Sequence, residues 1–283
     1  MMMKRFIHSS LRLAGLKLVK DNEGRFDLEL YQTTKDCQTT PRFINIGSGN
    51  FFHPCWFNVD KTNDFYRIDQ RNNSFIEHDL ASNIPLPFEN NSIEIFYCSH
   101  VVEHLPQASI NHLFQEFHRC LKPNGLLRVT CPDMELQYNA YMRNDTLFWP
   151  SPSPWGSNFI TNEFKLVEHF ATLLVHNQSK DQFSYQLTQE EVASLAEQTT
   201  MDLFFDKIIQ KLPADSNSRF PEGHCNWFSE NKLLDIFRNH HFNPARASRY
   251  GQSSDPRLRN TDLFDKTCPW LSLYVEGRKE VDS

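Results

Sequence analysis

Short apolar runs alternate with longer polar or amphipathic stretches over the first half of the chain. Their length and their content of β-branched and aromatic residues are typical of buried strands. Strands are expected near residues 42–46, 56–59, 75–77, 93–98, 125–131 and 271–275. Helices are expected near 107–121 and 229–240, and the second begins at Ser229, a favourable N-cap residue, ahead of an apolar stripe. This alternation predicts an α/β fold with a mostly parallel sheet and helices on both faces.

The first connection of this sheet is unusually short. Few residues separate Gly49 from the strand that starts at Trp56. A full crossover helix normally needs a dozen or more residues. We therefore expect the first helix to be reduced to a turn or two.

A long segment after the fifth strand breaks the alternation. Its Pro- and Trp-rich entry at 149–156 cannot form a regular helix, and polar helical stretches follow at about 161–176 and 188–211. The expected organisation is an N-terminal extension at 1–40, a core at 41–133 and 223–283, and an inserted subdomain at 134–222. Because the insertion leaves the carboxyl edge of the sheet, we expect a lid that selects the substrate. The alternative is decoration with no role in binding.

A small-residue loop and a carboxylate follow the first two expected strands. Gly47-Ser48-Gly49 ends the first strand and Asp60 ends the second. Glycines let the backbone approach a ligand closely, and an acid at the second strand end accepts hydrogen bonds from ribose hydroxyls. The pattern indicates a nucleoside-containing cofactor, although a Gly-x-Gly pair alone also occurs in plain tight turns.

Further segments give the chain a recognisable family pattern. They are His78-Asp79-Leu80, the stretch from Ser99 to Leu105, and the stretch from Leu121 to Asp133. With the glycine loop, they resemble the class I S-adenosylmethionine-dependent methyltransferases, most closely the methyltransferase 11-type proteins and a subgroup linked to surface-polysaccharide biosynthesis. The resemblance covers about residues 42–133 and returns at 223–224, 253–260 and 271–276. It implies S-adenosylmethionine as cofactor and a Rossmann-like, seven-stranded sheet with an antiparallel last strand.

The resemblance also assigns the glycine loop to the cofactor. Gly47 and Gly49, in one loop with Asn45 and Ser48, would pass under its methionine part. The loop departs from the family pattern at two positions. Asn45 replaces the more usual acid, and Asn50 stands where a third glycine is common.

The remaining cofactor contacts follow in the same way. The resemblance implies that Asp60 holds the ribose, that Asp79 accepts a hydrogen bond from the adenine amine, and that Leu80 covers the ring. Ser99 and His100, just after the fourth strand, would line the methionine and acceptor side.

The segment His100-Val101-Val102-Glu103-His104 also matches the H-x-x-E-H pattern of inverted zincin peptidases. An apolar strand and matching methyltransferase segments surround it, which argues against a peptidase. Some ubiquinone-pathway and small-RNA methyltransferases bind a divalent cation through a Glu-x-x-Glu-His arrangement. Here His100 replaces the first glutamate, and His224 offers a distant ligand. We expect no metal and favour structural hydrogen bonds for Glu103 and His104, with the cation site as the alternative.

Methyl transfer requires little chemistry from the protein beyond in-line positioning and compensation of the lost sulfonium charge. An oxygen acceptor must also lose a proton, which requires a base with a suitable pKa. His104, Asp133 and His224 are the candidate catalytic residues. We expect the acceptor to be a glycan or glycan precursor. The alternatives are another small metabolite or a non-catalytic protein that keeps the cofactor site.

Charge argues against a nucleic-acid partner. The net charge is −6 and the pI is near 6.1, so the chain has no general basic field. Four arginines cluster near the end, at 246, 249, 257 and 259. They are either contacts for an anionic sugar or phosphate, or scattered surface residues.

Cysteine use and hydropathy suggest a cytoplasmic protein. The seven cysteines include no Cys-x-x-Cys pair, and no secretory signal is expected, so we expect reduced thiols. No apolar run approaches the roughly 20 residues of a membrane span. Basic residues between 4 and 20 accompany apolar positions at helical spacing. This segment is expected to be a helix packed on the domain, or alternatively a weak interfacial helix at the inner face of a membrane.

Overall fold

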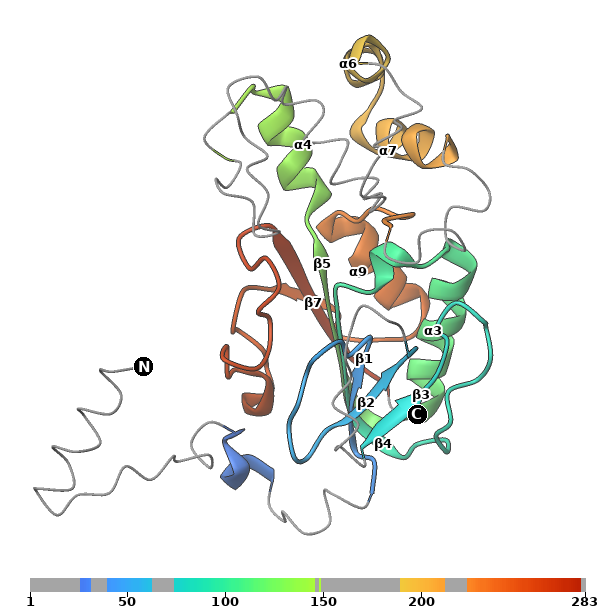
Figure 1. Cartoon of the computed structure of the whole chain (residues 1–283), viewed down its shortest axis with the longest axis vertical. Coiled ribbons are helices and arrows are strands. Elements are labelled where there is room, and N and C mark those ends of the chain that lie inside the picture. The colour runs from blue at the N-terminus through green and yellow to red at the C-terminus, as the bar shows by residue number, and fades with distance from the viewer. Residues whose placement is uncertain are drawn as a thin grey trace, which may run out of the picture.

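The computed structural model describes residues 26–31, 40–62, 74–145, 148, 189–211 and 223–280. A seven-stranded sheet with the order β3-β2-β1-β4-β5-β7-β6 forms its centre (Figure 1). The strands are β1 (Phe43–Ile46), β2 (Phe57–Asp60), β3 (Phe75–Glu77), β4 (Ile93–Ser99), β5 (Leu121–Pro132), β6 (Arg246–Ser248) and β7 (Ser272–Arg278). Strands β1 to β5 run parallel to one another, and β7 is antiparallel to both of its neighbours, β5 and β6. The predicted fold class is confirmed.

Alternating side chains of the strands build a core on each face of the sheet. Ile44 and Phe96 pack on one face, with α3 (Gln107–Cys120) and α9 (Glu230–Asn239) covering them. Phe43 and Tyr97 point to the other face, where the cover comes from η1 (Leu28–Tyr31), η4 (Pro256–Leu258) and the loop that contains Phe264. Burial on both faces explains why the strands read as continuous apolar runs.

The sheet differs from the sequence prediction at the start of β5 and at β6. The helix α3 runs directly into β5 at Leu121, four residues before the expected start at Gly125, and a register shift between Ile93 and Ile95 absorbs the extra length. The edge strand β6 was not predicted, since three partly exposed residues carry no clear apolar pattern. The short first connection is as expected, because the described residues 50–56 contain turns but no helix.

A second, smaller core lies beyond the carboxyl end of β5. The helices are α4 (Met134–Met142), α6 (Gln189–Gln198) and α7 (Met201–Gln210), and α4 continues directly from β5 (Figure 1). Their buried residues cluster around Phe204, Phe205 and Trp227. The expected helix at 161–176 and the Pro-rich entry lie outside the described residues, as does most of the N-terminal extension. The two helices α6 and α7 replace the single stretch expected at 188–211, because Thr200 caps α7 and interrupts the run.

Among the described helices, none combines the length and the apolar character that crossing a membrane would require. Among the described cysteines, Cys98, Cys120, Cys131 and Cys268 are free thiols, whereas Cys55 is disulfide-bonded. The expectation of reduced thiols is therefore wrong at Cys55.

Candidate active site

The loop after β1 is shaped by glycine. Gly47 has φ +64°, and a Cβ built on it would come within 2.1 Å of Cγ2 of Val101. Gly49 also has a positive φ, +49°. No other residue type fits at Gly47 without displacing Val101, so this loop and the segment after β4 form one surface.

Asp60, the last residue of β2, holds this loop in place. Its Oδ2 accepts a hydrogen bond from the Gly49 N–H at 2.9 Å, and its Oδ1 accepts one from the Lys61 N–H at 2.8 Å. Burial raises the pKa of the Asp60 carboxyl, and these backbone donors oppose the rise. A half-buried carboxylate with free lone pairs beside a glycine turn is the arrangement expected of a ribose-binding acid.

Asp79 and Leu80 follow β3 at the same edge of the sheet. Lys61 Nζ lies 2.7 Å from Asp79 Oδ2, and this hydrogen bond is the main reason that the pKa of Asp79 is lowered. The Ala81 N–H also donates to Asp79 Oδ1, at 3.0 Å. Leu80 packs partly buried against the main core. Lys61 was missed by the sequence analysis, although a cation directly after the candidate ribose acid is a visible signal.

The other loop residues make internal contacts. Asn45 is buried and its Nδ2 donates to Asn58 Oδ1 at 3.4 Å, so it ties β1 to β2. Ser48 is buried, and its hydroxyl has no hydrogen-bond partner among the described residues. Ser99 Oγ lies 3.0 Å from Thr130 Oγ1 at the ends of β4 and β5.

His100 occupies a left-handed backbone position with φ +55°, directly after β4. Its Nε2 lies 2.8 Å from Ser272 Oγ, and its Nδ1 lies 3.2 Å from Glu103 Oε1. Ser272, at the start of β7, was not foreseen as an orienting residue because it lies 172 positions away in sequence.

Glu103, His104 and His224 form a compact cluster beside the glycine loop. One ligand atom from each lies within 4.8 Å of the others. The rings of His104 and His224 are 4.8 Å apart at an angle of 70°. Both histidines are candidate catalytic residues from the sequence, and the structure brings them together.

Backbone contacts explain how two distant segments meet at this cluster. The carbonyl oxygen of Glu103 accepts hydrogen bonds from Cys225 N at 2.8 Å and from Asn226 N at 3.1 Å. The 3₁₀ helix η3 (Val102–His104) is thereby fixed to the chain around Gly223-His224.

The carboxylate of Glu103 is only 1% exposed. Burial opposes its ionisation, but the adjacent His100 ring and the charges of His104 and His224 outweigh this and lower the pKa of Glu103 to about 2. The 3.2 Å approach to His100 is poorly aligned, so by strict geometry neither carboxylate oxygen has a hydrogen-bond partner among the described residues. The side-chain hydrogen bonds that we expected for Glu103 are thus largely missing.

Asp133, the third candidate catalytic residue, has a different environment. It is the N-cap of α4, and its Oδ1 accepts a hydrogen bond from the Leu136 N–H at 3.0 Å. Burial raises the pKa of its carboxyl. Its position supports a structural role at the entry of the inserted helices.

A comparison with protein families covers much of this site. Residues 56–129, from just before β2 to near the end of β5, match the family model described as a methyltransferase domain. The protein is an S-adenosylmethionine-dependent methyltransferase. The matched segment of this methyltransferase contains Asp60, Asp79, His100, Glu103 and His104.

Solved structures similar to this methyltransferase are distant. A methyltransferase from Thermotoga maritima, described as a possible histamine N-methyltransferase, is 13% identical with a TM-score of 0.41, over 90% of each chain. One from Mesorhizobium loti is 11% identical with a TM-score of 0.42, over 88% of this chain and 100% of that one. One from Archaeoglobus fulgidus is 10% identical with a TM-score of 0.42, over 98% and 99%. No curated protein shows significant sequence similarity to the chain.

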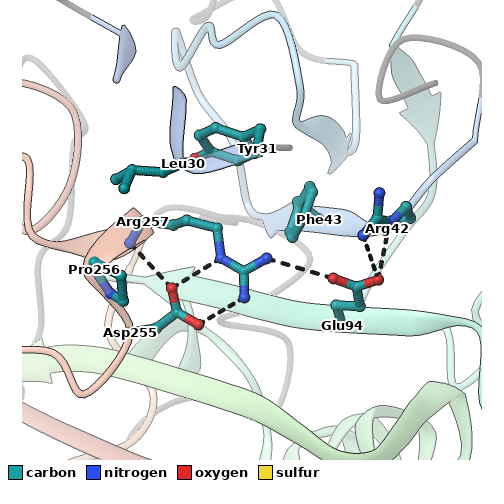
Figure 2. A pocket seen from close by; sticks show the side chains of 8 residues that line it. All are labelled: Leu30, Tyr31, Arg42, Phe43, Glu94, Asp255, Pro256 and Arg257. Atoms are coloured by element: carbon teal, nitrogen blue, oxygen red, sulfur yellow. Dashed lines mark hydrogen bonds and ion pairs between the residues drawn. The ribbon is translucent and has the colours of Figure 1, made fainter. Parts of the chain in front are cut away.

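A separate pocket lies at the opposite edge of the methyltransferase sheet. It has a volume of about 280 Å³ and is lined by Leu30, Tyr31, Arg42, Phe43, Glu94, Asp255, Pro256 and Arg257. Figure 2 shows that its charged groups are directed at one another: Arg257 lies 2.7 Å from Asp255, and Arg42 lies 2.8 Å from Glu94. These charges are already paired, so the pocket is a structural junction between the start of β1, the start of β4 and η4.

The arginines near the C-terminus all have protein partners. Arg246 pairs with Glu276, Arg249 with Glu230 and Arg257 with Asp255, while Arg259 donates to the carbonyl oxygen of Ser253. The contacts favour the structural alternative over an anion site.

Proposed function

We propose that this methyltransferase transfers a methyl group to a hydroxyl oxygen of a glycan or glycan precursor. The observation that carries the proposal is the approach of His104 and His224, whose rings are 4.8 Å apart beside the glycine loop. A hydroxyl acceptor must lose a proton during transfer, and imidazole nitrogens near a buried carboxylate are suited to promote that loss. The glycan assignment rests on the sequence resemblance to a polysaccharide-linked subgroup.

The cofactor is proposed to lie across the carboxyl ends of β1, β2 and β3. Gly47, Ser48 and Gly49 would contact its methionine part, with Asn45 supporting their loop from below. Asp60 would bind the ribose hydroxyls, and Asp79 and Leu80 would bracket the adenine. Ser99 and His100 would then stand between the methyl group and the acceptor. In support, the described contacts at Asp60 leave carboxylate lone pairs available, and Leu80 is partly exposed.

The inserted helices are proposed to form one wall of the acceptor site. The ring of Phe205 on α7 stacks on Trp227 at 4.9 Å, and Trp227 Nε1 donates to Asp206 Oδ1 at 2.9 Å. Trp227 lies three residues after His224. A helix that packs on this segment is well placed to enclose an acceptor that reaches the histidines.

A mass-shift screen tests the proposed acceptor class. Purified protein and S-adenosylmethionine would be incubated with separate pools of sugars, nucleotide-sugars, lipid-linked saccharides and hydroxylated or aminated small metabolites. The proposal expects one added methyl group on a member of a saccharide pool, at an oxygen that fragmentation can locate. Transfer only to a metabolite pool would overturn the glycan assignment, and transfer to nitrogen would overturn the O-methyl assignment.

A further inference from the structure

The buried carboxylate of Glu103 is the least satisfied polar group near the site. It is 1% exposed, and neither of its oxygens has a well-aligned hydrogen-bond partner among the described residues. Burial of a carboxylate is unfavourable unless hydrogen bonds, an opposite charge or a metal ion compensates it. The nearest polar atoms are ring nitrogens, His100 Nδ1 at 3.2 Å and His104 Nε2 at 3.9 Å from Oε1.

The hydrogen bonds on the far side of each ring determine what these nitrogens can do. His104 Nδ1 faces the carbonyl oxygen of Gly223 at 3.3 Å. A carbonyl oxygen only accepts, so Nδ1 carries the hydrogen. In the neutral ring the lone pair is then on Nε2, the nitrogen that faces Glu103.

The same reasoning applies to His100. Ser272 Oγ lies 3.1 Å from the carbonyl oxygen of Thr267 and 2.9 Å from that of Cys268, so its single proton is donated to one of them. Ser272 must therefore accept from His100 Nε2, at 2.8 Å. The lone pair of the neutral His100 ring is then on Nδ1, which also faces Glu103.

We propose that Glu103, His104 and His224 bind one divalent transition-metal ion. Ring lone pairs of His100 and His104 face the carboxylate of Glu103, and among the described residues no well-aligned donor satisfies that carboxylate. A bound cation would compensate its charge. Histidines that bind a metal usually donate the other ring N–H to a carbonyl or hydroxyl oxygen, as His104 does here. This assignment favours the alternative that the sequence analysis ranked below structural hydrogen bonds.

The distances require only a small contraction. The ligand atoms of Glu103, His104 and His224 lie within 4.8 Å of one another. Zinc bonds to nitrogen and carboxylate oxygen are about 2.0–2.2 Å long, so ligand atoms around zinc lie roughly 3.3 Å apart. Side-chain rotation of His104 and His224 can supply this difference, since both are partly exposed.

The donor set selects the class of ion. Two imidazoles and one carboxylate suit zinc, cobalt, iron or manganese, whereas magnesium and calcium prefer oxygen ligands. Three protein ligands also leave coordination positions open, as in catalytic rather than structural metal sites.

The inference deepens the proposed function and rests on it for one step only. If the acceptor is a hydroxyl compound, an open coordination position beside the glycine loop would hold its oxygen and lower its pKa. His104 and His224 then promote proton loss as ligands of the ion. Binding of the ion itself does not depend on the acceptor.

Metal binding is tested without any acceptor. Tag-free protein is stripped with chelator, dialysed and titrated with Zn²⁺ by calorimetry, with the bound metal counted by elemental analysis. Titration with Co²⁺ adds a visible absorption spectrum that reports nitrogen and oxygen ligation. We expect about one bound equivalent of either ion. Bound Co²⁺ should also show the visible absorption of nitrogen and oxygen ligation, which requires the histidines as ligands.

Three variants make the result specific. His224→Ala and Glu103→Gln should each weaken Zn²⁺ binding at least tenfold, while His241→Ala should leave it unchanged. His241 is a matched control because it is an exposed histidine whose Nδ1 lies 3.9 Å from Glu280 Oε2. If Glu103→Gln does not fold, His224→Ala carries the test, since it removes only a partly exposed ring.

Two outcomes would overturn the site. One is wild-type protein that binds neither Zn²⁺ nor Co²⁺ at a defined stoichiometry. The other is equal affinity in wild type and His224→Ala. A protein that binds the ion but methylates no saccharide would refute the proposed function and leave the metal site standing.

Discussion

Gly47 and Val101 are packed so closely that a single methyl group on Gly47 would overlap the Val101 side chain, at 2.1 Å from its Cγ2. This contact joins the loop after β1 to the segment that carries His100, Glu103 and His104. The glycine loop and the histidine cluster are therefore parts of one surface at the carboxyl edge of the sheet.

The first prediction concerns this contact. Gly47→Ala should lower the free energy of unfolding by about 2–4 kcal/mol, because overpacking adds to the strain of a Cβ at φ +64°. Adding Val101→Ala should restore part of the loss by removing the clash, while the backbone strain remains. Chemical denaturation of the single and double variants measures both effects. If Val101→Ala gives no recovery, the steric account of Gly47 is wrong.

A second prediction concerns the buried ion pairs that connect β5 to the C-terminal strands. The Arg128 side chain is fully buried, with Nη2 2.6 Å from Asp265 Oδ2 and Nη1 3.3 Å from Glu276 Oε2. Arg128→Met would leave the buried carboxylate of Asp265 without its cation, whereas Glu276 keeps Arg246, and it should cost about 3–5 kcal/mol of stability.

The matched control for Arg128 is an exposed arginine. Arg238 lies 2.9 Å from Asp235, and more than half of each side chain is exposed. Arg238→Met should change the free energy of unfolding by less than about 1 kcal/mol. If both variants lose the same free energy of unfolding, burial does not determine how much each ion pair contributes to stability.

The positions of most strands along the chain and the glycine turn after β1 could be predicted because they depend on local patterns. Apolar runs such as Ile93–Cys98 are buried on both faces only in the interior of a sheet. Gly47 adopts a positive φ that other residue types disfavour. The antiparallel final strand came from the family resemblance alone.

The environment of the candidate site could not be predicted in the same way. His104 meets His224 only because backbone N–H groups of Cys225 and Asn226 bind the carbonyl oxygen of Glu103, and such contacts leave no pattern in the sequence. Asp133 looked similar to the histidines in sequence, yet its position makes it a helix cap. The role of Ser272 depends on a strand that lies far along the chain.

A third prediction is that the free energy of unfolding depends on pH through His53. His53 is 1% exposed; its Nε2 lies 2.9 Å from the Phe26 carbonyl oxygen, and its Nδ1 accepts a hydrogen bond from the Cys55 N–H. Burial lowers the pKa of His53 from 6.5 to about 4. Protonation would also remove the acceptor at Nδ1.

The folded pKa lies below the unfolded one, so the contribution of His53 is fully present above about pH 6.5 and is lost as the pH falls toward 4. A shift of this size corresponds to roughly 3 kcal/mol. Denaturation curves between pH 7.5 and 4.5 should show a shallower loss for His53→Gln than for wild type. His241→Gln, at an exposed histidine, should follow the wild-type curve, and parallel curves for all three proteins would refute the assignment.

The fourth prediction tests the wall that the inserted helices are proposed to form. Phe205→Ala removes the ring that stacks on Trp227 and should loosen α7. Once an acceptor is known, its KM should rise at least about fivefold, while cofactor affinity stays within about threefold, because α7 is assigned to the acceptor side. Leu203→Ala, at an exposed position of the same helix, is the control. An unchanged acceptor KM would show that the wall is elsewhere.

The most direct test of the whole account is a calorimetric titration of S-adenosylhomocysteine into wild-type protein, Asp60→Ala and Asp262→Ala. The account predicts one bound equivalent in wild type and a loss of about 1.5–3 kcal/mol in Asp60→Ala, the range for hydrogen bonds to a charged group. Asp262, an exposed carboxylate with no proposed role in cofactor binding, should be replaceable without effect. No binding by wild type, or equal affinity in wild type and Asp60→Ala, would contradict the placement of the cofactor at this edge of the sheet.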